Sequence, residues 1–118
     1  MRFEKLLNKL TNYSIHHSHK ISCVIARGNK IVGVGVNKIK THPRSNHPWS
    51  MIHAELDAIL GCNKEDLNGA DIYIYRQNKN GKLACSKPCT YCHELILLSG
   101  IKRVIYTFEG SYKEEKLK

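Results

Sequence analysis

Two short stretches of the sequence carry residue types that together can bind a metal ion and activate water. His53-Ala54-Glu55 offers an imidazole and a carboxylate, and Pro88-Cys89-Thr90-Tyr91-Cys92 offers a pair of thiols. One imidazole and two thiolates are zinc ligands of the kind that leaves a fourth tetrahedral position open for water. A carboxylate beside such a position can move protons. The pattern therefore predicts a hydrolytic metal site.

The two stretches resemble the signature of the zinc-dependent cytidine/deoxycytidylate deaminase superfamily, which is H-x-E followed by P-C-x-x-C. The residue identities and the C-x-x-C spacing match together, which makes the resemblance specific. It implies that His53, Cys89 and Cys92 bind Zn²⁺ and that Glu55 shuttles protons without being a ligand. It also implies that backbone groups near Ala54, Pro88 and Cys89 help to hold the reacting base.

Two alternatives for these cysteines are a structural zinc site and a redox pair. A closed structural site usually takes four protein ligands in two spaced pairs, and here only Cys89 and Cys92 form a close pair. Cys85 lies four residues before Cys89 and could compete as a ligand. We interpret Cys23 as a small buried hydrophobic residue and place Cys62 at the end of a helix.

Length and composition predict one domain that spans residues 1–118. With 42% hydrophobic and 25% charged residues, the chain has the composition of an ordinary globular protein. Because no apolar run approaches membrane-spanning length and the first residues lack a signal-peptide core, we expect a cytoplasmic protein without a membrane partner. Five cysteines, an odd number, argue against a secreted disulfide framework.

The chain is strongly basic, with 19 Lys and Arg against 10 Asp and Glu and a formal net charge of +9. A basic surface attracts polyanions, so single-stranded nucleic acid and a phosphorylated nucleotide are both candidate partners. A basic surface without a dedicated partner is the alternative. The lysines are scattered along the chain and form no Arg-rich block or aromatic-basic segment. Charge alone therefore does not choose the substrate.

Hydrophobic periodicity and turn residues predict the elements in order. Helices are expected at residues 2–15, from about 51 to 60 after Ser50 as N-cap, and from Pro88 to the Gly100 stop. Strands are expected at 21–27, 31–36, 71–77, 102–108 and 111–117, the last as an antiparallel edge strand. We therefore predict an α/β fold, a three-layer α/β/α sandwich with a mixed sheet of about five strands. Two helices would face each other at the zinc site, with the first helix against the sheet.

Further residues are candidates for holding substrate or shaping its pocket. In the superfamily that the motifs resemble, an Asn at the end of the second strand contacts the nucleoside, and Asn37 falls at the matching place; a turn-forming Asn is the alternative. Gly33 and Gly35 indicate close backbone approach, either of substrate or of a neighbouring helix. In the loop 38–49, Arg44 could bind a phosphate and Trp49 could stack on a base, although a basic loop with one packed Trp would look the same.

The leading hypothesis is zinc-dependent deamination of a cytosine nucleoside or nucleotide to the uracil product. The second is a deaminase that acts on cytosine or adenine in single-stranded DNA or RNA, and the third is a zinc-bearing binding module without catalysis. The resemblance leaves guanine and pterin-like bases open, and it implies a homo-oligomer. Its subclass cues disagree. The predicted hairpin at the end of the chain, formed by the strands 102–108 and 111–117, resembles the cytidine deaminase branch. His53 argues against that branch, because its members usually have a Cys at this position.

Overall fold

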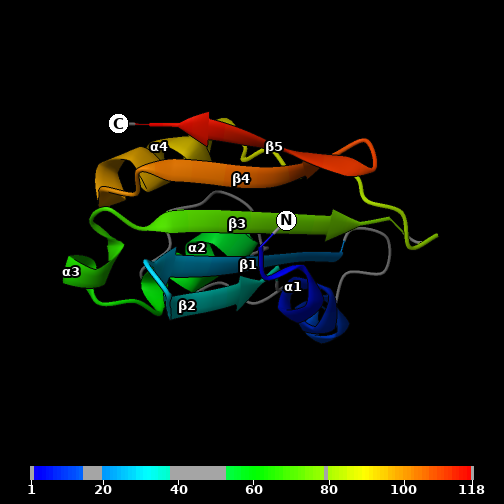
Figure 1. Ribbon diagram of the computed structural model, residues 1–118, viewed down its shortest axis with the longest axis horizontal. Helices are drawn as coiled ribbons and strands as arrows, with labels where there is room; N and C mark the ends of the chain where they lie inside the picture. Colours follow the sequence, from blue (N-terminus) through cyan, green and yellow to red (C-terminus); the bar gives the residue numbers. More distant parts are fainter. Residues whose placement is uncertain (1, 15–19, 38–52, 79, 118) are drawn as a thin grey trace.

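The computed structural model describes residues 2–14, 20–37, 53–78 and 80–117. A five-stranded mixed sheet with strand order β2-β1-β3-β4-β5 forms the centre of the molecule (Figure 1). β3 and β4 are parallel, whereas the other neighbouring strands are antiparallel. The predicted mixed sheet of about five strands is confirmed. The strands are β1 Lys20–Arg27, β2 Lys30–Val36, β3 Asp71–Gln77, β4 Arg103–Phe108 and β5 Ser111–Lys116.

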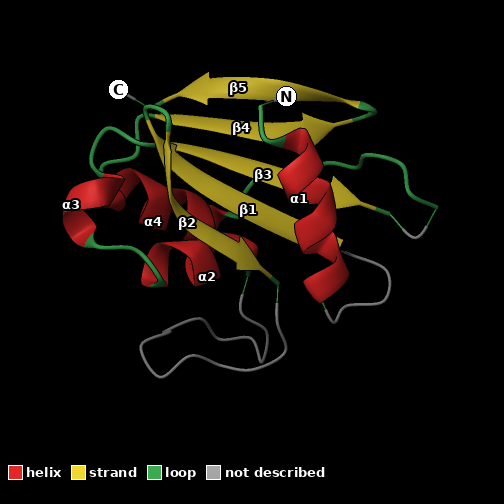
Figure 2. Ribbon diagram, turned by 60° about the horizontal axis from the view of Figure 1, so that its bottom comes forward, coloured by secondary structure: helices red, strands yellow, loops and turns green. Residues whose placement is uncertain are grey.

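Helices cover both faces of this sheet and complete the predicted three layers (Figure 2). One face carries α1, Glu4–Leu10, which continues into the 3-10 turn η1, Thr11–Tyr13. The other face carries α2, Ala54–Leu60, the short α3, Lys64–Leu67, and α4, Thr90–Ser99. Within the described ranges, every helix is too short or too polar to span a bilayer.

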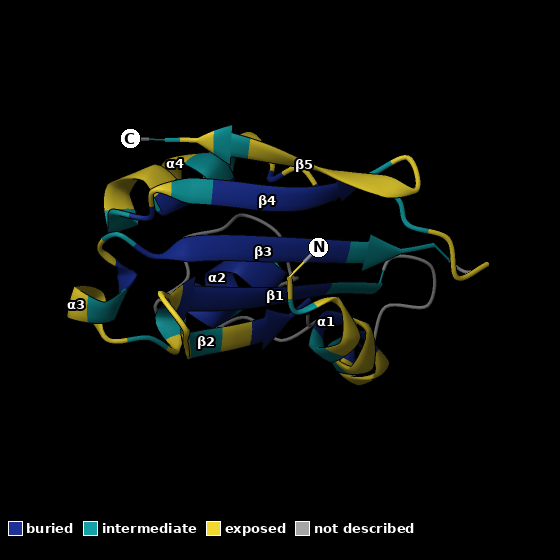
Figure 3. Ribbon diagram, in the orientation of Figure 1, coloured by how far each residue is buried: buried dark blue, intermediate teal, exposed yellow. Residues whose placement is uncertain are grey.

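The buried area is concentrated in the three central strands, β1, β3 and β4 (Figure 3). Both faces of these strands lie under helices or neighbouring side chains, so their sequences read as nearly continuous apolar runs. β5 differs, because it is an outer strand with mostly exposed, charged side chains. Charges on an outer strand disfavour pairing with another chain.

The two helices that carry the candidate metal ligands begin later than the sequence indicates. α2 starts at Ala54, not near Met51, because His53 has an extended backbone with φ −71° and ψ 152° and acts as the N-cap. Its carbonyl oxygen accepts the first helical hydrogen bond from the Asp57 amide at 3.0 Å. The predicted N-cap Ser50 lies outside the described residues. In the same way, Cys89 is the extended N-cap of α4, so only Cys92 of the two cysteines lies within the helix.

Three smaller differences concern the surface. The first helix ends earlier than predicted, with Thr11–Tyr13 as a 3-10 turn. The segment before Gly69, where the sequence predicts no helix, contains α3, whose single turn is too short to produce a helical hydrophobic pattern. The hairpin connection is shorter than predicted because Lys30 already belongs to β2, which leaves Gly28, with φ 63°, and Asn29 as the turn.

Two glycines allow α2 to lie directly against β2. A Cβ atom on Gly35 would stand 2.4 Å from the Ala54 carbonyl oxygen and 2.6 Å from the Ala58 amide nitrogen. A Cβ atom on Gly33 would stand 2.2 Å from the Cys62 sulfur. The expected close backbone approach is therefore confirmed, and the neighbour is a helix. This contact sets the distance between the sheet and the first turn of α2.

We expect Gly35→Ala to destabilise the protein by about 1–3 kcal/mol, because the new methyl group would meet helix backbone that must shift. Gly61→Ala is the matched control, since its Cβ would find no atom nearer than 3.6 Å and its φ of −84° suits alanine. Chemical denaturation of both variants measures the difference in free energy of unfolding. Equal stability of the two variants would contradict the packing of α2 on β2.

Candidate metal centre

Three of the residues singled out by the sequence lie together in space. The Nδ1 atom of His53 lies 3.6 Å from the Cys89 sulfur and 3.3 Å from the Cys92 sulfur. The three ligand atoms all lie within 4.8 Å of one another. Among the described residues, this is the one group of three or more His, Cys, Asp and Glu side chains placed to hold a metal ion. The side chains converge from the N-terminal ends of α2 and α4.

The spacing of these atoms fits a tetrahedral zinc ion. With zinc bonds of about 2.0 Å to nitrogen and about 2.3 Å to sulfur, tetrahedral angles place the nitrogen and a sulfur roughly 3.5 Å apart. The two observed separations, 3.6 and 3.3 Å, bracket that value. The chemistry of the donor set agrees, because imidazole and thiolate are preferred zinc ligands. Only small adjustments would be needed to bind the ion.

Glu55 lies in the first turn of α2 and points into the protein. It is 5% exposed, and its carboxylate interacts with the Cys92 thiol. Burial raises the pKa of the Glu55 carboxyl, and hydrogen bonds from its own backbone amide and from Cys92 partly oppose this rise. A buried carboxylate beside three metal-binding groups is placed to exchange protons with anything bound there.

The electrostatics of the site favour a cation. Burial raises the pKa of the Cys92 thiol, and the negative charges of Glu55 and Cys89 raise it further. A bound metal ion reverses this effect, since a coordinating thiol is deprotonated outright. The exposures of the ligands differ: Cys92 is buried, His53 is partly buried and Cys89 is exposed. Of these three residues, Cys89 is therefore the one that solvent reaches most easily.

The other cysteines lie outside this group. Cys85 is exposed and is not among the three clustered residues, although only four residues separate it from Cys89. Cys23 is fully buried in the core, as predicted. Cys62 follows the C-cap of α2, also as predicted, and its thiol lies 3.2 Å from the carbonyl oxygens of Val32 and Ala58.

Asn37 directly follows β2 and is 1% exposed. Its side-chain oxygen accepts hydrogen bonds from the Ser14 hydroxyl and, at 3.1 Å, from the Ile21 amide. This oxygen therefore joins the end of β2 to β1 and to the segment after η1. The predicted contact between Asn37 and substrate stays a prediction.

The remaining predicted substrate-binding residues divide into two groups. Ala54 and Pro88 are buried and directly adjoin the candidate ligands His53 and Cys89 in the chain. Arg44 and Trp49 lie outside the described residues. The same holds for the rest of the loop 38–49.

One residue of the site region was not singled out from the sequence. Asp57 lies in the first turn of α2, and its carboxylate accepts a hydrogen bond from the Val36 amide at 3.1 Å. The same residue donates its own amide hydrogen to the His53 carbonyl. Asp57 therefore links the N-cap His53 to the end of β2. An acidic residue in a first turn is a common helix signal, so the sequence alone could not indicate this second partner.

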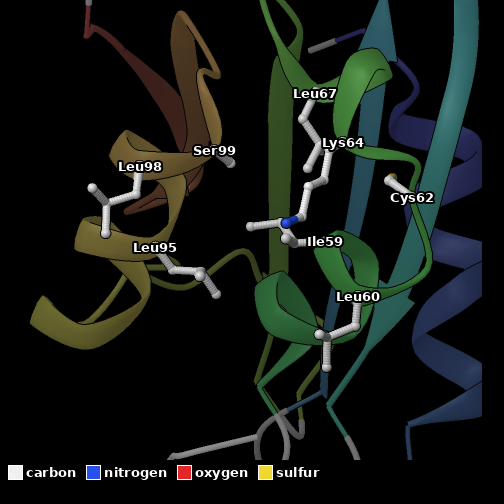
Figure 4. Close-up of a pocket in the computed structure, with 8 residues that line it drawn as sticks. All are labelled: Ile59, Leu60, Cys62, Lys64, Leu67, Leu95, Leu98 and Ser99. Carbon is white, nitrogen blue, oxygen red and sulfur yellow. The ribbon is translucent and has the colours of Figure 1, made fainter. Parts of the chain in front are cut away.

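The surface also carries a groove that is separate from the candidate metal centre. It has a volume of about 400 Å³ and lies between the α2–α3 region and α4 (Figure 4). None of the candidate metal ligands lines it. Its walls are mainly apolar, and Leu98, at its edge, is 86% exposed. The lining residues are Ile59, Leu60, Cys62, Lys64, Leu67, Leu95, Leu98 and Ser99.

Residues 2–108 match the family model described as the cytidine and deoxycytidylate deaminase zinc-binding region. The chain therefore belongs to this family, and zinc is the metal that the family model and the donor set support.

Several curated relatives are deoxycytidylate deaminases. The enzyme of Mycobacterium phage D29 is 43% identical over 59 residues, which cover 50% of this chain and 38% of the relative. The human enzyme is 30% identical over 99 residues, or 72% of this chain and 50% of the relative. The enzyme of Enterobacteria phage T4 is 33% identical over 107 residues, or 86% and 47%. The chain thus spans about half the length of the curated relatives it matches.

Solved structures show the same fold. The apo dCMP deaminase of the cyanophage S-TIM5 matches with a TM-score of 0.65 and 20% identity, covering 86% of this chain and 76% of that chain. The RibD protein of Acinetobacter baumannii matches with a TM-score of 0.54 and 21% identity, covering 86% and 26%. At these identities the likeness extends to the fold alone.

We expect Cys89→Ala to lose most of its zinc, because the ion would keep only one thiolate and one imidazole. Cys85→Ala is the matched control, since both thiols are exposed and only four residues apart. Elemental analysis after dialysis against a mild chelator gives the zinc content of each variant. The reverse result, with zinc lost in Cys85→Ala and kept in Cys89→Ala, would show that the ligand set is wrong.

Proposed function

We propose that this chain carries out zinc-dependent hydrolytic deamination of a cytosine nucleotide, with deoxycytidylate as the leading substrate. The observation that carries the proposal is the convergence of His53 Nδ1 and the two cysteine sulfurs within 4.8 Å, beside the buried carboxylate of Glu55. Family membership and the names of the relatives support the same chemistry. Hydrolysis would replace the exocyclic amino group with a carbonyl and release ammonia.

In this proposal His53, Cys89 and Cys92 hold the metal ion. Two thiolates and a neutral imidazole carry a total charge that balances a divalent cation. When bound, zinc supplies a Lewis acid that lowers the pKa of water towards neutral. The exposure of Cys89 leaves the metal side of the site accessible, so a base can approach from there.

Glu55 moves the protons of the reaction. Its carboxylate would accept a proton from the attacking water and deliver it to the ring nitrogen beside the carbon under attack. Protonation makes that carbon more electrophilic. Glu55 would then take the second proton from the hydroxyl group that is now on this carbon and pass it to the amino group. Ammonia leaves, a carbonyl remains, and the carboxylate ends in the ionised form in which it began. Its place in the first turn of α2, two residues after His53, suits this role.

The contacts of Ala54, Pro88 and Asn37 with the substrate are assigned by the resemblance of the motifs, whereas those of Arg44 and Trp49 are assigned by their residue types. Backbone groups at Ala54 and Pro88 would hold the base, because both residues adjoin the ligands and are buried. Asn37 would contact the sugar from the end of β2. Arg44 would bind the phosphate, and Trp49 would stack on the substrate.

We expect Glu55→Gln to keep its zinc and to lose at least about 100-fold in turnover, because an amide cannot accept and return the proton. Glu94→Gln is the control: it makes the same change on the exposed side of α4 and should keep full activity. Ammonia release by the zinc-loaded proteins measures both. Unchanged turnover in Glu55→Gln would remove Glu55 from the mechanism.

A second candidate function, deamination within single-stranded nucleic acid, is favoured by the net charge of +9. A panel of deoxycytidylate, deoxycytidine, cytidylate, and a single strand containing cytosine and adenine separates the two. We expect turnover of deoxycytidylate with modest salt dependence, whereas strand deamination would weaken steeply as salt increases. Turnover of the strand alone would replace the proposed substrate.

Within the same panel, Arg44→Ala should raise the KM for deoxycytidylate far more than the KM for deoxycytidine, because only the nucleotide carries the phosphate. Equal losses on both compounds would exclude a phosphate contact at Arg44.

We infer further that the chain acts as a homo-oligomer in the cytoplasm. The exposed Leu98 and the apolar groove beside it support association. Five free cysteines suit a reducing compartment. Light scattering at micromolar concentration measures the mass in solution, and a strictly monomeric, fully active protein would contradict the oligomer.

A further inference from the structure

The parallel strands β3 and β4 stop pairing before they end. Their register runs from the pair Asp71 and Arg103 to the pair Ile74 and Tyr106. Beyond that point, the chain that returns from the end of β3 towards α4 (Figure 1) binds both strands. The Ala84 amide donates to the Arg76 carbonyl at 3.0 Å, and the Ser86 amide donates to the Thr107 carbonyl at 2.9 Å. The segment 84–86 therefore replaces the missing strand pairing.

Two hydroxyl groups complete this junction. Ser86 Oγ donates to the Ile74 carbonyl at 2.8 Å and accepts from the Thr107 amide at 2.8 Å. Thr107 Oγ1 lies 2.7 Å from the Ala84 carbonyl oxygen and accepts from the Arg76 amide at 3.1 Å. The two hydroxyl oxygens are 2.9 Å apart. Together they serve backbone groups of both strands and of the returning segment.

The junction is shielded from water. Ser86 is 5% exposed and Thr107 is 1% exposed. In such surroundings a backbone group that loses its partner cannot turn to solvent, so the segment must shift to satisfy it. The Arg76 guanidinium adds a contact from the edge of the junction, with Nη1 donating to the Cys85 carbonyl at 3.1 Å.

The junction lies close to the metal centre along the chain. Lys87 and Pro88 alone separate Ser86 from Cys89. Pro88 is buried, and its ring fixes the backbone angle φ. Cys89 then caps α4, with its carbonyl accepting from the His93 amide at 2.8 Å. A connection this short cannot absorb a displacement of Ser86 without moving the Cys89 sulfur.

We propose that Ser86 and Thr107 are positioning residues of the metal centre, whose paired hydroxyls fix the point from which Cys89 reaches the ion. The proposal rests on the assignment of Cys89 as a ligand under the proposed function. His53 is positioned from the other side through α2 and β2, so the two halves of the centre have separate supports. Loss of the hydroxyl pair should therefore displace Cys89 and leave His53 in place.

The test compares Thr107→Val with Thr107→Ser. Valine keeps the shape of threonine and lacks the hydroxyl, whereas serine keeps the hydroxyl and lacks the methyl group. Competition with a chromophoric chelator gives the zinc dissociation constant, and the absorption bands of the Co²⁺-substituted proteins report the geometry of the thiolates. We expect Thr107→Val to weaken zinc binding about 10- to 100-fold and to shift the Co²⁺ bands. Thr107→Ser should stay close to the wild type in both.

Leu7→Ala controls for a general loss of stability, because Leu7 is the fully buried residue of α1, which packs on the opposite face of the sheet from α2 and α4. It should lower the melting temperature without moving the Co²⁺ bands. If Thr107→Val does not fold, Ser86→Ala takes its place in the same measurements. Zinc affinity and Co²⁺ bands equal to those of the wild type in a folded hydroxyl-deleted variant would overturn the proposal.

Failure of the proposed function gives a different result. If Cys89→Ala binds zinc as tightly as the wild type, Cys89 is not a ligand. The proposed function is then contradicted, because it requires Cys89 among the zinc ligands. If Cys89→Ala loses zinc while the hydroxyl-deleted variant keeps it unchanged, the proposed ligand stands and only the positioning role of Ser86 and Thr107 is wrong.

Discussion

The metal centre depends on one geometric requirement, which is that the imidazole of His53 meets the thiols of Cys89 and Cys92, which come 36 and 39 residues later in the chain, within a few ångströms. His53 is the N-cap of α2, and the two cysteines lie at the start of α4. The N-terminal ends of the two helices must therefore lie next to each other. The observed separations of 3.6 and 3.3 Å between the His53 nitrogen and the sulfurs leave little tolerance. A shift of about an ångström in either helix would separate the ligand atoms too far for one ion.

Each helix is held by a different device. α2 lies against β2 because Gly35 has no side chain there, and Asp57 ties its first turn to the Val36 amide. α4 starts where β3 and β4 separate, at the C-terminal ends of parallel strands, which is where α/β proteins commonly place their sites. Side-chain packing alone would allow a helix to slide slightly along the sheet. The contacts with the strand backbone restrict this movement at the N-terminal ends of α2 and α4, which carry the candidate ligands.

Burial gives the site its electrostatic character. Burial is the largest cause of the raised pKa of the Cys92 thiol, and the negative charges of Glu55 and Cys89 raise this pKa further. Burial also raises the pKa of the Glu55 carboxyl. Acidic groups gathered in a poorly solvated place repel one another. A divalent cation relieves that repulsion and keeps the thiols as thiolates. The metal is therefore expected to contribute to folding as well as to chemistry.

The sequence was sufficient for the order of the five strands and the three longer helices, for the mixed sheet and for the clustering of His53, Cys89 and Cys92. These follow from short-range signals: hydrophobic runs for strands and two compact motifs for the site. The helix starts were predicted too early, because an extended N-cap at His53 or Cys89 has no distinctive residue type. The partners of Asp57 and of Asn37 could not be predicted either, since they depend on which backbone groups the register brings near them. The detail that Nδ1 of His53 is the ring nitrogen near the two sulfurs also required the structure.

The most direct test of the account is X-ray absorption at the zinc edge of the zinc-loaded protein. Three protein ligands and an open fourth position predict two sulfur atoms at about 2.3 Å, one imidazole nitrogen at about 2.0 Å and one further light atom that is not imidazole. A shell of three or four sulfur atoms, or a second imidazole, would mean a closed structural site. That result would contradict the account of the metal centre as a place where water can react.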